Sequence, residues 1–238
     1  MNGLEKLSTK GSIAARKDGR TLHENAYDTL KEMILSAELP PGFLAIEQEI
    51  SDKLKMSRTP VREALIRLES EGMITIFPRR GFRVSSVSVE DAREIFHVLG
   101  ALEVAAVEQM TSQEESARHA ACILLEGAVK SMGSALDAGD LDAWADADRE
   151  FHRLLLECCG NGRLMAFADT MWNQAHRVRL ITLRLRPLPT GSTKDHGDLV
   201  NLIYKGDVDA ACELHRTHRK KYMQMLMKLM DDYRLNHV

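Results

Sequence analysis

The sequence predicts a mainly α-helical protein made of two domains, and three observations lead to this prediction. Apolar residues recur at helical spacing along most of the 238 residues. Aromatic residues make up only 5% of the chain, while Leu, Met and Ala are plentiful, which favours helices over β-sandwiches. A serine-rich stretch at residues 85–88 separates a segment with helix and hairpin signals from one with helix signals alone. We therefore expect one domain at 22–86 and a second, helical domain at 87–238.

The N-terminal part begins with a predicted arm and two helices. Residues 1–21 are polar, contain scattered glycines and have no hydrophobic period, which is typical of a flexible arm. A first helix is expected at 22–37, and Pro40-Pro41-Gly42 ends it with a turn. A second, short helix is expected at 47–54. The apolar stripe of the first helix comprises Ala26, Leu30, Met33 and Ile34.

A third predicted helix runs from about residue 57 to residue 68. Ser57 supplies an oxygen where the helix needs a cap, and Pro60 fits its first turn. Arg58 and Arg62 are four positions apart and so point the same way, opposite an apolar stripe. Such arginines can form a solvated helix face. Alternatively they contact DNA, because a guanidinium can bind a guanine edge or a phosphate through two hydrogen bonds.

A predicted hairpin follows this helix and favours the second interpretation. Gly72 ends the helix, and residues 73–77 and 82–84 read as two short strands. The turn between them carries Arg79 and Arg80. A helix followed by a hairpin with arginines at its tip is the arrangement of a winged helix-turn-helix, which binds DNA.

The rest of the chain predicts a bundle of about six helices with an internal pocket. A capping box at Ser88–Asp91 opens the first of these helices, and Asp140 caps the third. Gly160-Asn161-Gly162 and the loop at 187–192 separate later helices. The first of the six helices is expected to begin at 88 and to include Val107, and the others are expected at about 113–136, 140–159, 163–184, 193–205 and 207–232.

Charge and composition limit the class of protein. The net charge is −3, but residues 1–88 hold 14 Lys and Arg against 12 Asp and Glu, and the remainder holds 18 against 23. A weakly positive head on an acidic body predicts local, salt-sensitive phosphate contact by a dimer rather than general coating of nucleic acid. No apolar run is long enough to span a membrane and no signal peptide is present. The four cysteines lack metal-site spacing, so we expect reduced thiols in the cytoplasm.

One pair of residues in the bundle suggests a metal site. Asp148 and His152 are four positions apart on one predicted helix and reach the same side of it. A carboxylate and an imidazole placed in this way can hold a divalent metal, or they can form an ion pair on the helix surface. His196 and His218 follow on later helices. The residues alone leave both interpretations open.

The N-terminal motifs are similar to those of a known family. The motifs SRTPVREAL at 57–65 and RRGFRV at 79–84, with Tyr27-x-x-Leu30 and Glu47-x-Glu49-Ile50-Ser51, resemble the DNA-binding domain of GntR-family transcription regulators over about residues 22–84. The resemblance implies operator DNA as the partner. It implies major-groove contact by Ser57, Arg58, Thr59 and Arg62, and wing contact by Arg80 and Gly81.

One residue departs from the pattern of that family. The fatty-acid regulator of the family has an arginine at the position of Gln48. Glutamine can still bind an adenine or a phosphate, but one positive charge is lost. We therefore expect Gln48 to contact DNA, but the operator preference of that regulator does not carry over to this chain.

The C-terminal motifs resemble the FCD effector domain of the FadR subfamily over about residues 89–233. They are Asp148-x-x-Phe151-His152, Asp195-His196-x-x-Leu199 and Ala211-x-x-Leu214-x-x-x-His218. The metal site of that family is one aspartate and three histidines. The resemblance therefore assigns this role to Asp148, His152, His196 and His218, with Zn²⁺, Ni²⁺ or Mn²⁺ as the ion and open positions for a small carboxylate.

Other residues near the predicted pocket admit two interpretations each. His176 lines the pocket or is structural, and Arg177 and Arg179 meet an acidic effector or are solvated, with solvation favoured for both arginines. His215 orients a metal ligand or lies on the surface, which is the favoured interpretation. Leu99 stands where the family often has an arginine, so one anion contact is missing.

Together these features predict a transcription regulator. We expect a cytoplasmic, nucleoid-associated homodimer that binds a palindromic operator, represses a catabolic operon and responds to a carboxylate or sugar-acid effector. A metal-dependent enzyme is the main alternative, but the sequence has no nucleophile elbow, His-Glu-x-x-His motif or phosphate loop. An architectural DNA protein without a ligand is disfavoured by the large acidic C-terminal part.

Overall fold

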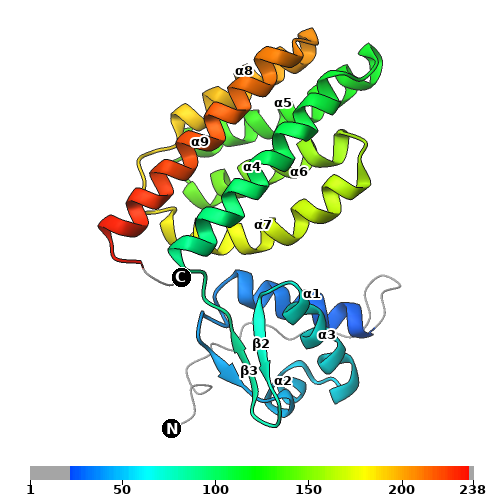
Figure 1. Cartoon of the computed structure of the whole chain (residues 1–238), viewed down its shortest axis with the longest axis vertical. Helices are drawn as coiled ribbons and strands as arrows, with labels where there is room; N and C mark the ends of the chain where they lie inside the picture. Colours follow the sequence, from blue (N-terminus) through cyan, green and yellow to red (C-terminus); the bar gives the residue numbers. More distant parts are fainter. Residues whose placement is uncertain (1–21, 236–238) are drawn as a thin grey trace. The chain divides into compact units, whose positions relative to one another are not determined.

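The structure is a computed structural model that describes residues 22–235, so the predicted arm at 1–21 lies outside the described residues. The chain divides into two compact units, with the division between Ser86 and Val87. The described residues form nine helices and three short strands (Figure 1). None of the described helices combines the length and the apolar character needed to cross a bilayer.

The N-terminal unit is a winged helix-turn-helix, as predicted. Its three strands form an antiparallel sheet in the order β1-β3-β2, in which Leu44 lies opposite Arg83 and Ile76 lies opposite Phe82. The elements are α1 (Leu22–Leu35), β1 (Leu44–Ala45), α2 (Glu47–Leu54), α3 (Arg58–Ser70), β2 (Ile74–Phe77) and β3 (Gly81–Val84).

The apolar stripe predicted for the first helix forms one side of the core of this unit. Its four residues are buried, and they pack with Val61, Leu65 and Leu68 of α3. The helix ends at Leu35, two residues earlier than predicted, because Ala37 adopts a left-handed conformation with φ +58°. Helix α3 turns its apolar side chains toward this core and its arginines toward solvent.

Two local features of this unit differ from the prediction. Strand β1 was not predicted, because two residues carry no periodic signal and the strand exists only through its pairing with β3. Ser57 occupies the N-cap position of α3, but its side chain makes no capping hydrogen bond. The prediction of a side-chain cap was therefore wrong, and the hydroxyl is exposed instead.

The C-terminal unit is an all-helical bundle, and its six helices confirm the predicted number. The capping box at Ser88 is present, since the Ser88 Oγ accepts a hydrogen bond from the Asp91 backbone N–H. Asp140 likewise caps α6 through the Ala143 N–H. The helices are α4 (Val89–Thr111), α5 (Glu115–Asp137), α6 (Leu141–Cys158), α7 (Gly162–Thr182), α8 (Thr190–Lys205) and α9 (Val208–Asp232).

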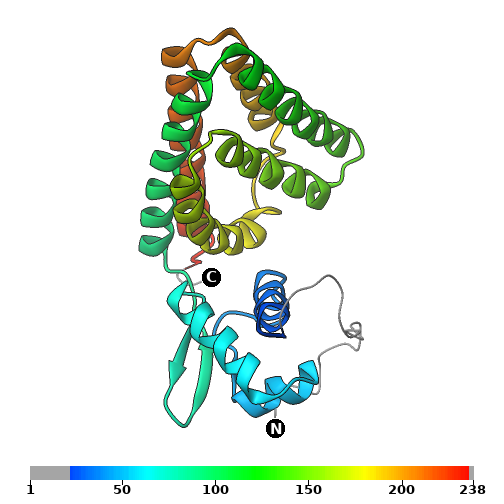
Figure 2. The same ribbon diagram turned by 90° about the vertical axis from the view of Figure 1, so that its right-hand side faces the viewer.

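The six helices of the bundle pack around one hydrophobic core. Helix α4 packs along α9 and against α7, while α5 packs against α6 and α8 (Figure 2). Trp144, Phe151 and Leu155 fill the buried face of α6. Asp148 lies on that same face, so the helix that builds the core also carries polar groups into it.

Candidate functional site

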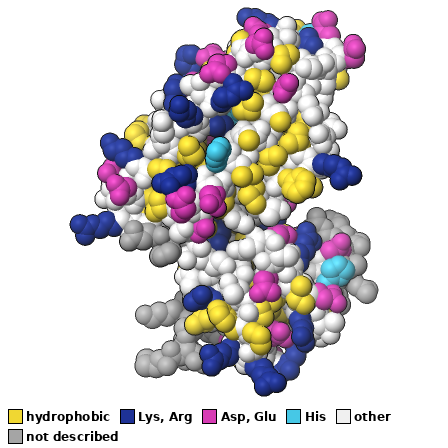
Figure 3. All heavy atoms as spheres, viewed as in Figure 1, with side chains coloured by type: hydrophobic (Ala, Val, Ile, Leu, Met, Phe, Trp, Pro, Cys, Tyr) yellow, Lys and Arg dark blue, Asp and Glu magenta, His cyan; other side chains and the backbone are white. Residues whose placement is uncertain are grey.

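The exposed edge of α3 carries the residues predicted to contact DNA. Ser57, Arg58, Thr59 and Arg62 are all exposed. The neighbouring Pro60 is buried, so the start of the helix is fixed by packing on one side and open on the other. Figure 3 shows Lys and Arg side chains gathered at one end of this unit.

A hydrogen-bonded chain holds Arg58 in place. The Arg58 Nε donates to the Gln48 Oε1 at 2.6 Å, and the Gln48 Nε2 donates to the Asp52 Oδ1 at 2.6 Å. Both bonds lie on the exposed surface. Through its bond to Nε, Gln48 fixes the direction in which the Arg58 guanidinium points. This link between α2 and α3 was not predicted.

The wing presents Arg79 and Arg80, both exposed, between β2 and β3. Arg79 has a left-handed backbone with φ +63°, which turns the chain at the tip. Gly81 has φ +93°, and a Cβ there would lie 2.1 Å from the Ala45 carbonyl oxygen. A glycine is therefore required at this position by the close approach of β1 to β3.

The four predicted metal ligands come together in the helical unit. Ligand nitrogens of His152, His196 and His218 lie within 4.8 Å of one another, and all three residues are buried. The Asp148 Oδ1 lies 3.0 Å from the His196 Nε2 and 3.9 Å from the His152 Nε2. The interpretation of Asp148 and His152 as a surface ion pair was therefore wrong, because both side chains face the core.

Two charged groups from other helices orient members of this set. Arg179 of α7 is ion-paired with the Asp148 Oδ2, which leaves Oδ1 facing the histidines. The His218 Nδ1 contacts the Asp195 Oδ2 at 3.1 Å, which leaves its Nε2 for another partner. Carboxylates bonded to the far nitrogen of a histidine fix its tautomer and its direction, as is common around metal sites.

Glu103 of α4 forms the centre of a second group behind His152. Its Oε2 lies 3.3 Å from the His152 Nδ1, 3.0 Å from the His215 Nε2 and 3.1 Å from the Arg219 Nε. The contact with His152 lacks hydrogen-bond geometry, and the Glu103 Oε1 has no partner among the described residues. Burial alone raises the pKa of Glu103, but Arg219, His152 and His215 outweigh it and hold the pKa well below its usual range.

Burial favours the neutral, metal-binding form of three histidines in this region, His196, His218 and His215. Burial, with His152 as the next cause, holds the pKa of His196 well below its usual value. The pKa of His218 is lowered in the same direction by burial and by His196. Burial also lowers the pKa of His215 to about 4, although Glu103 acts against it. Metal ligands must be deprotonated, so these neutral imidazoles suit a metal ion.

The donor set therefore fits a divalent metal. Nitrogens of His152, His196 and His218 lie within 4.8 Å of one another in the core, and the Asp148 Oδ1 lies beside two of these histidines. A nitrogen-rich set of this kind suits Zn²⁺, Ni²⁺ or Mn²⁺.

Several neighbouring residues lie elsewhere than predicted. Arg177 and Arg179 are both 4% exposed, so the favoured interpretation of two solvated arginines was wrong. His215 is buried and bonded to Glu103, which corrects its placement on the surface. His176 is not among the clustered histidines, and the charged groups that act on its pKa are Arg149 and Asp146. Leu99 is fully buried in the apolar core.

Sequence reasoning missed the groups that surround the ligands. Glu103, Asp195 and Arg179 come from different helices than the ligands they hold, so no spacing within one helix connects them. The adjacency of Asp195 to His196 was visible, but the partner of Asp195 is His218. Only the three-dimensional packing identifies it.

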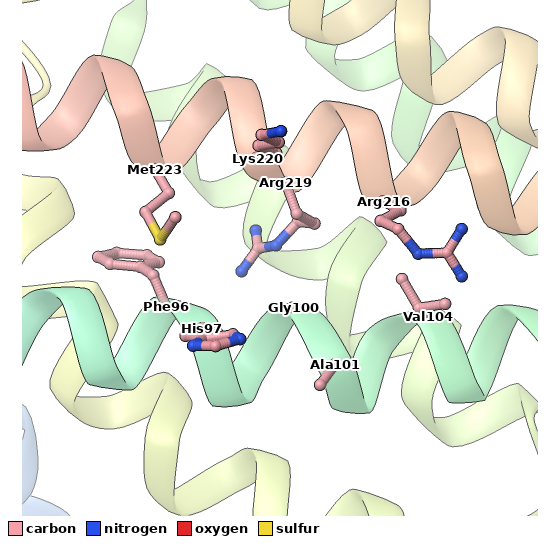
Figure 4. Close-up of a pocket in the computed structure, with 9 residues that line it drawn as sticks. All are labelled: Phe96, His97, Gly100, Ala101, Val104, Arg216, Arg219, Lys220 and Met223. Atoms are coloured by element: carbon pink, nitrogen blue, oxygen red, sulfur yellow. The ribbon is translucent and has the colours of Figure 1, made fainter.

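Two cavities open on the helical unit. One of about 390 Å³ reaches His218 and Asp195 and is also lined by Arg186, Tyr222 and the loop that begins at Pro187. The other, of about 510 Å³, is a groove between α4 and α9 (Figure 4), where Phe96 and Met223 face each other near Arg219. Figure 3 shows further hydrophobic side chains on this unit.

Comparison with known families agrees with both units. The family described as bacterial regulatory proteins of the gntR family matches residues 22–84, and the FCD domain family matches residues 94–221. The chain is a GntR-family transcriptional regulator with a C-terminal FCD domain. The proteins it matches are transcription regulators, so the alternative of a metal-dependent enzyme finds no support in the family.

Individual relatives of this GntR-family regulator cover most of the chain. An uncharacterized HTH-type transcriptional regulator from the TAR-I ttuE-ttuC' intergenic region of Agrobacterium vitis is 38% identical over 56% of this chain and 78% of its own length. The transcriptional repressor RspR of Escherichia coli K12 is 25% identical over 89% of this chain and 91% of its own. The solved structure of E. coli McbR/YncC shares the fold, with a TM-score of 0.71, 20% identity and coverage of 88% and 98%.

Proposed function

We propose that this GntR-family protein is a metabolite-responsive repressor of a catabolic operon. It binds a palindromic operator as a homodimer and is controlled by a small carboxylate or sugar acid beside a divalent metal. The observation that carries the proposal is the combination of an arginine-bearing α3 with a buried three-histidine centre in a separate unit. The relative RspR of Escherichia coli is named as a transcriptional repressor, which supports repression rather than activation.

The DNA surface in this proposal consists of α3, the wing and one residue of α2. Arg58 and Arg62 contact base edges or phosphates in the major groove, since a guanidinium can bind both. Arg80 reaches the neighbouring minor groove beside the turn at Gly81. The remaining contacts are assigned to Gln48, Ser57 and Thr59. The protein is then a cytoplasmic one that joins the nucleoid when it is bound to its operator.

The metal centre in this proposal is formed by Asp148, His152, His196 and His218. A bound divalent ion would supply an electrophilic site for a carboxylate oxygen. The chain itself contributes orientation, because Arg179 holds one oxygen of Asp148 and Asp195 holds the far nitrogen of His218. Arg177, which is buried on α7, remains a candidate for the effector pocket.

Control by the effector requires that its binding changes the affinity for DNA. The two sites lie in different units. Their coupling free energy is the amount by which effector binding changes the free energy of DNA binding, and DNA binding changes that of effector binding by the same amount. An effector that binds the DNA-free form more tightly weakens operator binding by the ratio of its two affinities. We expect release from DNA, as for a repressor whose operon degrades the effector.

A DNA-binding titration against the protein's own upstream region tests this function. We expect saturable binding, release by at least one sugar acid or small carboxylate, and loss of that release in the presence of a chelator. Arg62→Ala should abolish specific binding, while Arg93→Ala, on the exposed face of α4 and ion-paired with Glu90, should not. Unchanged binding by Arg62→Ala would contradict the assignment of α3.

Metal content is measured separately from DNA binding. His152→Ala should lose the metal and melt at a lower temperature than the metal-loaded protein, because an ion that binds only the folded state stabilises it. His97→Ala is the matched control, since His97 lies exposed on α4. Equal metal content in His152→Ala and the wild type would refute the site.

A further inference from the structure

We propose that the effector is a dicarboxylic acid whose second carboxylate binds Arg186 and Tyr222. This inference rests on the proposed function and narrows the class of the effector. The first carboxylate lies at the His218 end of the cavity beside the metal centre, and the second lies at the end lined by Arg186. The inference rests on three buried hydrogen-bond donors without an acceptor among the described residues, which are the Arg186 Nε, the Arg186 Nη2 and the Tyr222 hydroxyl.

Arg186 is a buried cation that lacks an acceptor. It is 8% exposed, and neither its Nε nor its Nη2 has a hydrogen-bond partner among the described residues. These two nitrogens lie on one edge of the guanidinium, the edge that binds a carboxylate through two parallel hydrogen bonds. A buried charge without a partner is strongly unfavourable, so this edge is suited to an anion that arrives from outside.

Tyr222 adds a third donor to the same place. Its hydroxyl is buried and has no partner among the described residues. Three guanidiniums surround its ring, with Arg186 at 5.6 Å, Arg219 at 5.8 Å and Arg179 at 5.9 Å from the ring centre. The Arg186 guanidinium also lies 5.1 Å from the Trp144 ring, which holds it from another side.

The charges around this ring leave one cation without a counter-ion. Arg179 is ion-paired with Asp148, and Arg219 lies 3.1 Å from Glu103. No carboxylate of the described residues pairs with Arg186. A ligand carboxylate would supply the missing negative charge and would accept hydrogen bonds from both Arg186 and the Tyr222 hydroxyl.

The cavity connects this position to the metal centre. It has a volume of about 390 Å³, enough for a small organic acid, and its lining includes both Arg186 and His218. Lys221 lies exposed in the same lining and attracts anions toward it. A monocarboxylate can occupy only one end of this cavity, whereas a dicarboxylate occupies both.

The test compares matched acids on the full chain in Zn²⁺-containing buffer. Malonate, succinate, glutarate and adipate are titrated by calorimetry beside monocarboxylates of equal carbon number. The wild type should bind at least one dicarboxylate about tenfold more tightly than its matched monocarboxylate, as expected for an added charge-assisted hydrogen-bonded pair. Arg186→Gln should remove this preference and leave monocarboxylate binding within about twofold. Arg184→Gln, in which an exposed arginine paired with Asp142 is lost, should keep the preference.

A second readout separates ligand binding from a structural role. Because Arg186 has no counter-ion, Arg186→Gln without ligand should melt at or above the wild-type temperature. A dicarboxylate should raise the melting temperature of the wild type and of Arg184→Gln but not that of Arg186→Gln. Equal affinity for every matched pair in the wild type, or a preference that persists in Arg186→Gln, would overturn the inference.

Failure of the inference is distinguishable from failure of the proposed function. If acids release DNA in a chelator-sensitive way but Arg186→Gln keeps the wild-type preference, the regulator stands and the second carboxylate site is wrong. If dicarboxylates bind through Arg186 but no acid changes DNA binding, the site stands and the regulatory role is wrong.

Discussion

The sharpest test of the buried charge arrangement is Glu103→Gln, which keeps the shape of the side chain and removes its charge. Glu103 is fully buried and faces Arg219 at 3.1 Å. At that distance and an effective dielectric constant of about 20, the attraction is about 5 kcal/mol. The amide oxygen of glutamine can still accept a hydrogen bond worth about 1 to 1.5 kcal/mol. We therefore expect the free energy of unfolding to fall by about 3 to 4 kcal/mol.

Urea denaturation in the presence of a chelator measures this loss without a contribution from metal. Glu108→Gln is the control, because Glu108 lies exposed on the same helix. Adding Arg219→Met to Glu103→Gln should restore part of the stability, since the uncompensated buried cation is then gone. A Glu103→Gln protein as stable as the control, or a double variant less stable than the sum of both changes, would refute the reasoning.

The same variant should also weaken metal binding. The Glu103 Oε2 lies 3.3 Å from the His152 Nδ1, and partners on the far side of a metal-binding histidine commonly contribute about 10- to 100-fold to affinity. Metal titration of Glu103→Gln against Glu108→Gln measures that factor. An unchanged metal affinity would show that Glu103 serves only Arg219 and His215.

Three further predictions concern other parts of the molecule. Gly81→Ala should lower the free energy of unfolding by at least about 2 kcal/mol in urea denaturation, because φ is +93° and the new Cβ would meet the Ala45 oxygen at 2.1 Å; wild-type stability would contradict this. Gln48→Ala should weaken DNA binding up to about tenfold without changing stability. Its effect should be smaller in an Arg58→Ala background, because part of it acts through the Arg58 guanidinium bonded to Gln48 at 2.6 Å; fully additive losses would argue against this link. Burial, with Arg149 as the next cause, lowers the pKa of His176 to about 4. As the pH falls from 6.5, the unfolded chain therefore takes up a proton at His176 while the folded chain does not. The free energy of unfolding then decreases with falling pH. His176→Gln should reduce the slope of stability against pH by up to about 1.4 kcal/mol per unit between pH 6.5 and 4, and an unchanged slope would show that His176 is not the group responsible.

The features that the sequence predicted correctly are those fixed by neighbouring residues. The burial of Leu30 and the caps at Ser88 and Asp140 follow from helical spacing and from side chains that bond three positions ahead. Strand β1 could not be predicted in this way, because its two residues are held by β3 across a long separation in the chain. The proposed metal role of Asp148 and the three histidines depended on a family resemblance, since the spacing of Asp148 and His152 alone favoured a surface pair.

The arginines of α7 show why burial was misjudged. Arg177 and Arg179 are about 200° apart around a helix, so the usual one-sided pattern would leave at least one of them in water. Both are 4% exposed, which means that α7 is enclosed on opposite faces. Enclosure of this kind depends on the packing of α4, α6 and α9 against α7, and no property of the α7 sequence reports it.

Helix α4 links the site to the start of the helical unit, because its residue Glu103 contacts two groups of the site. Helix α4 begins at Val89, directly after the division between the two units, and carries Glu103 about 21 Å further along its axis. Glu103 contacts His152 of the proposed metal set and Arg219, which borders the ring of Tyr222. A ligand that moves either the histidine or the arginine therefore acts on α4 itself. Because a helix transmits displacement along its length more readily than a loop does, α4 is the element through which we expect occupation of the site to reach the DNA-binding unit.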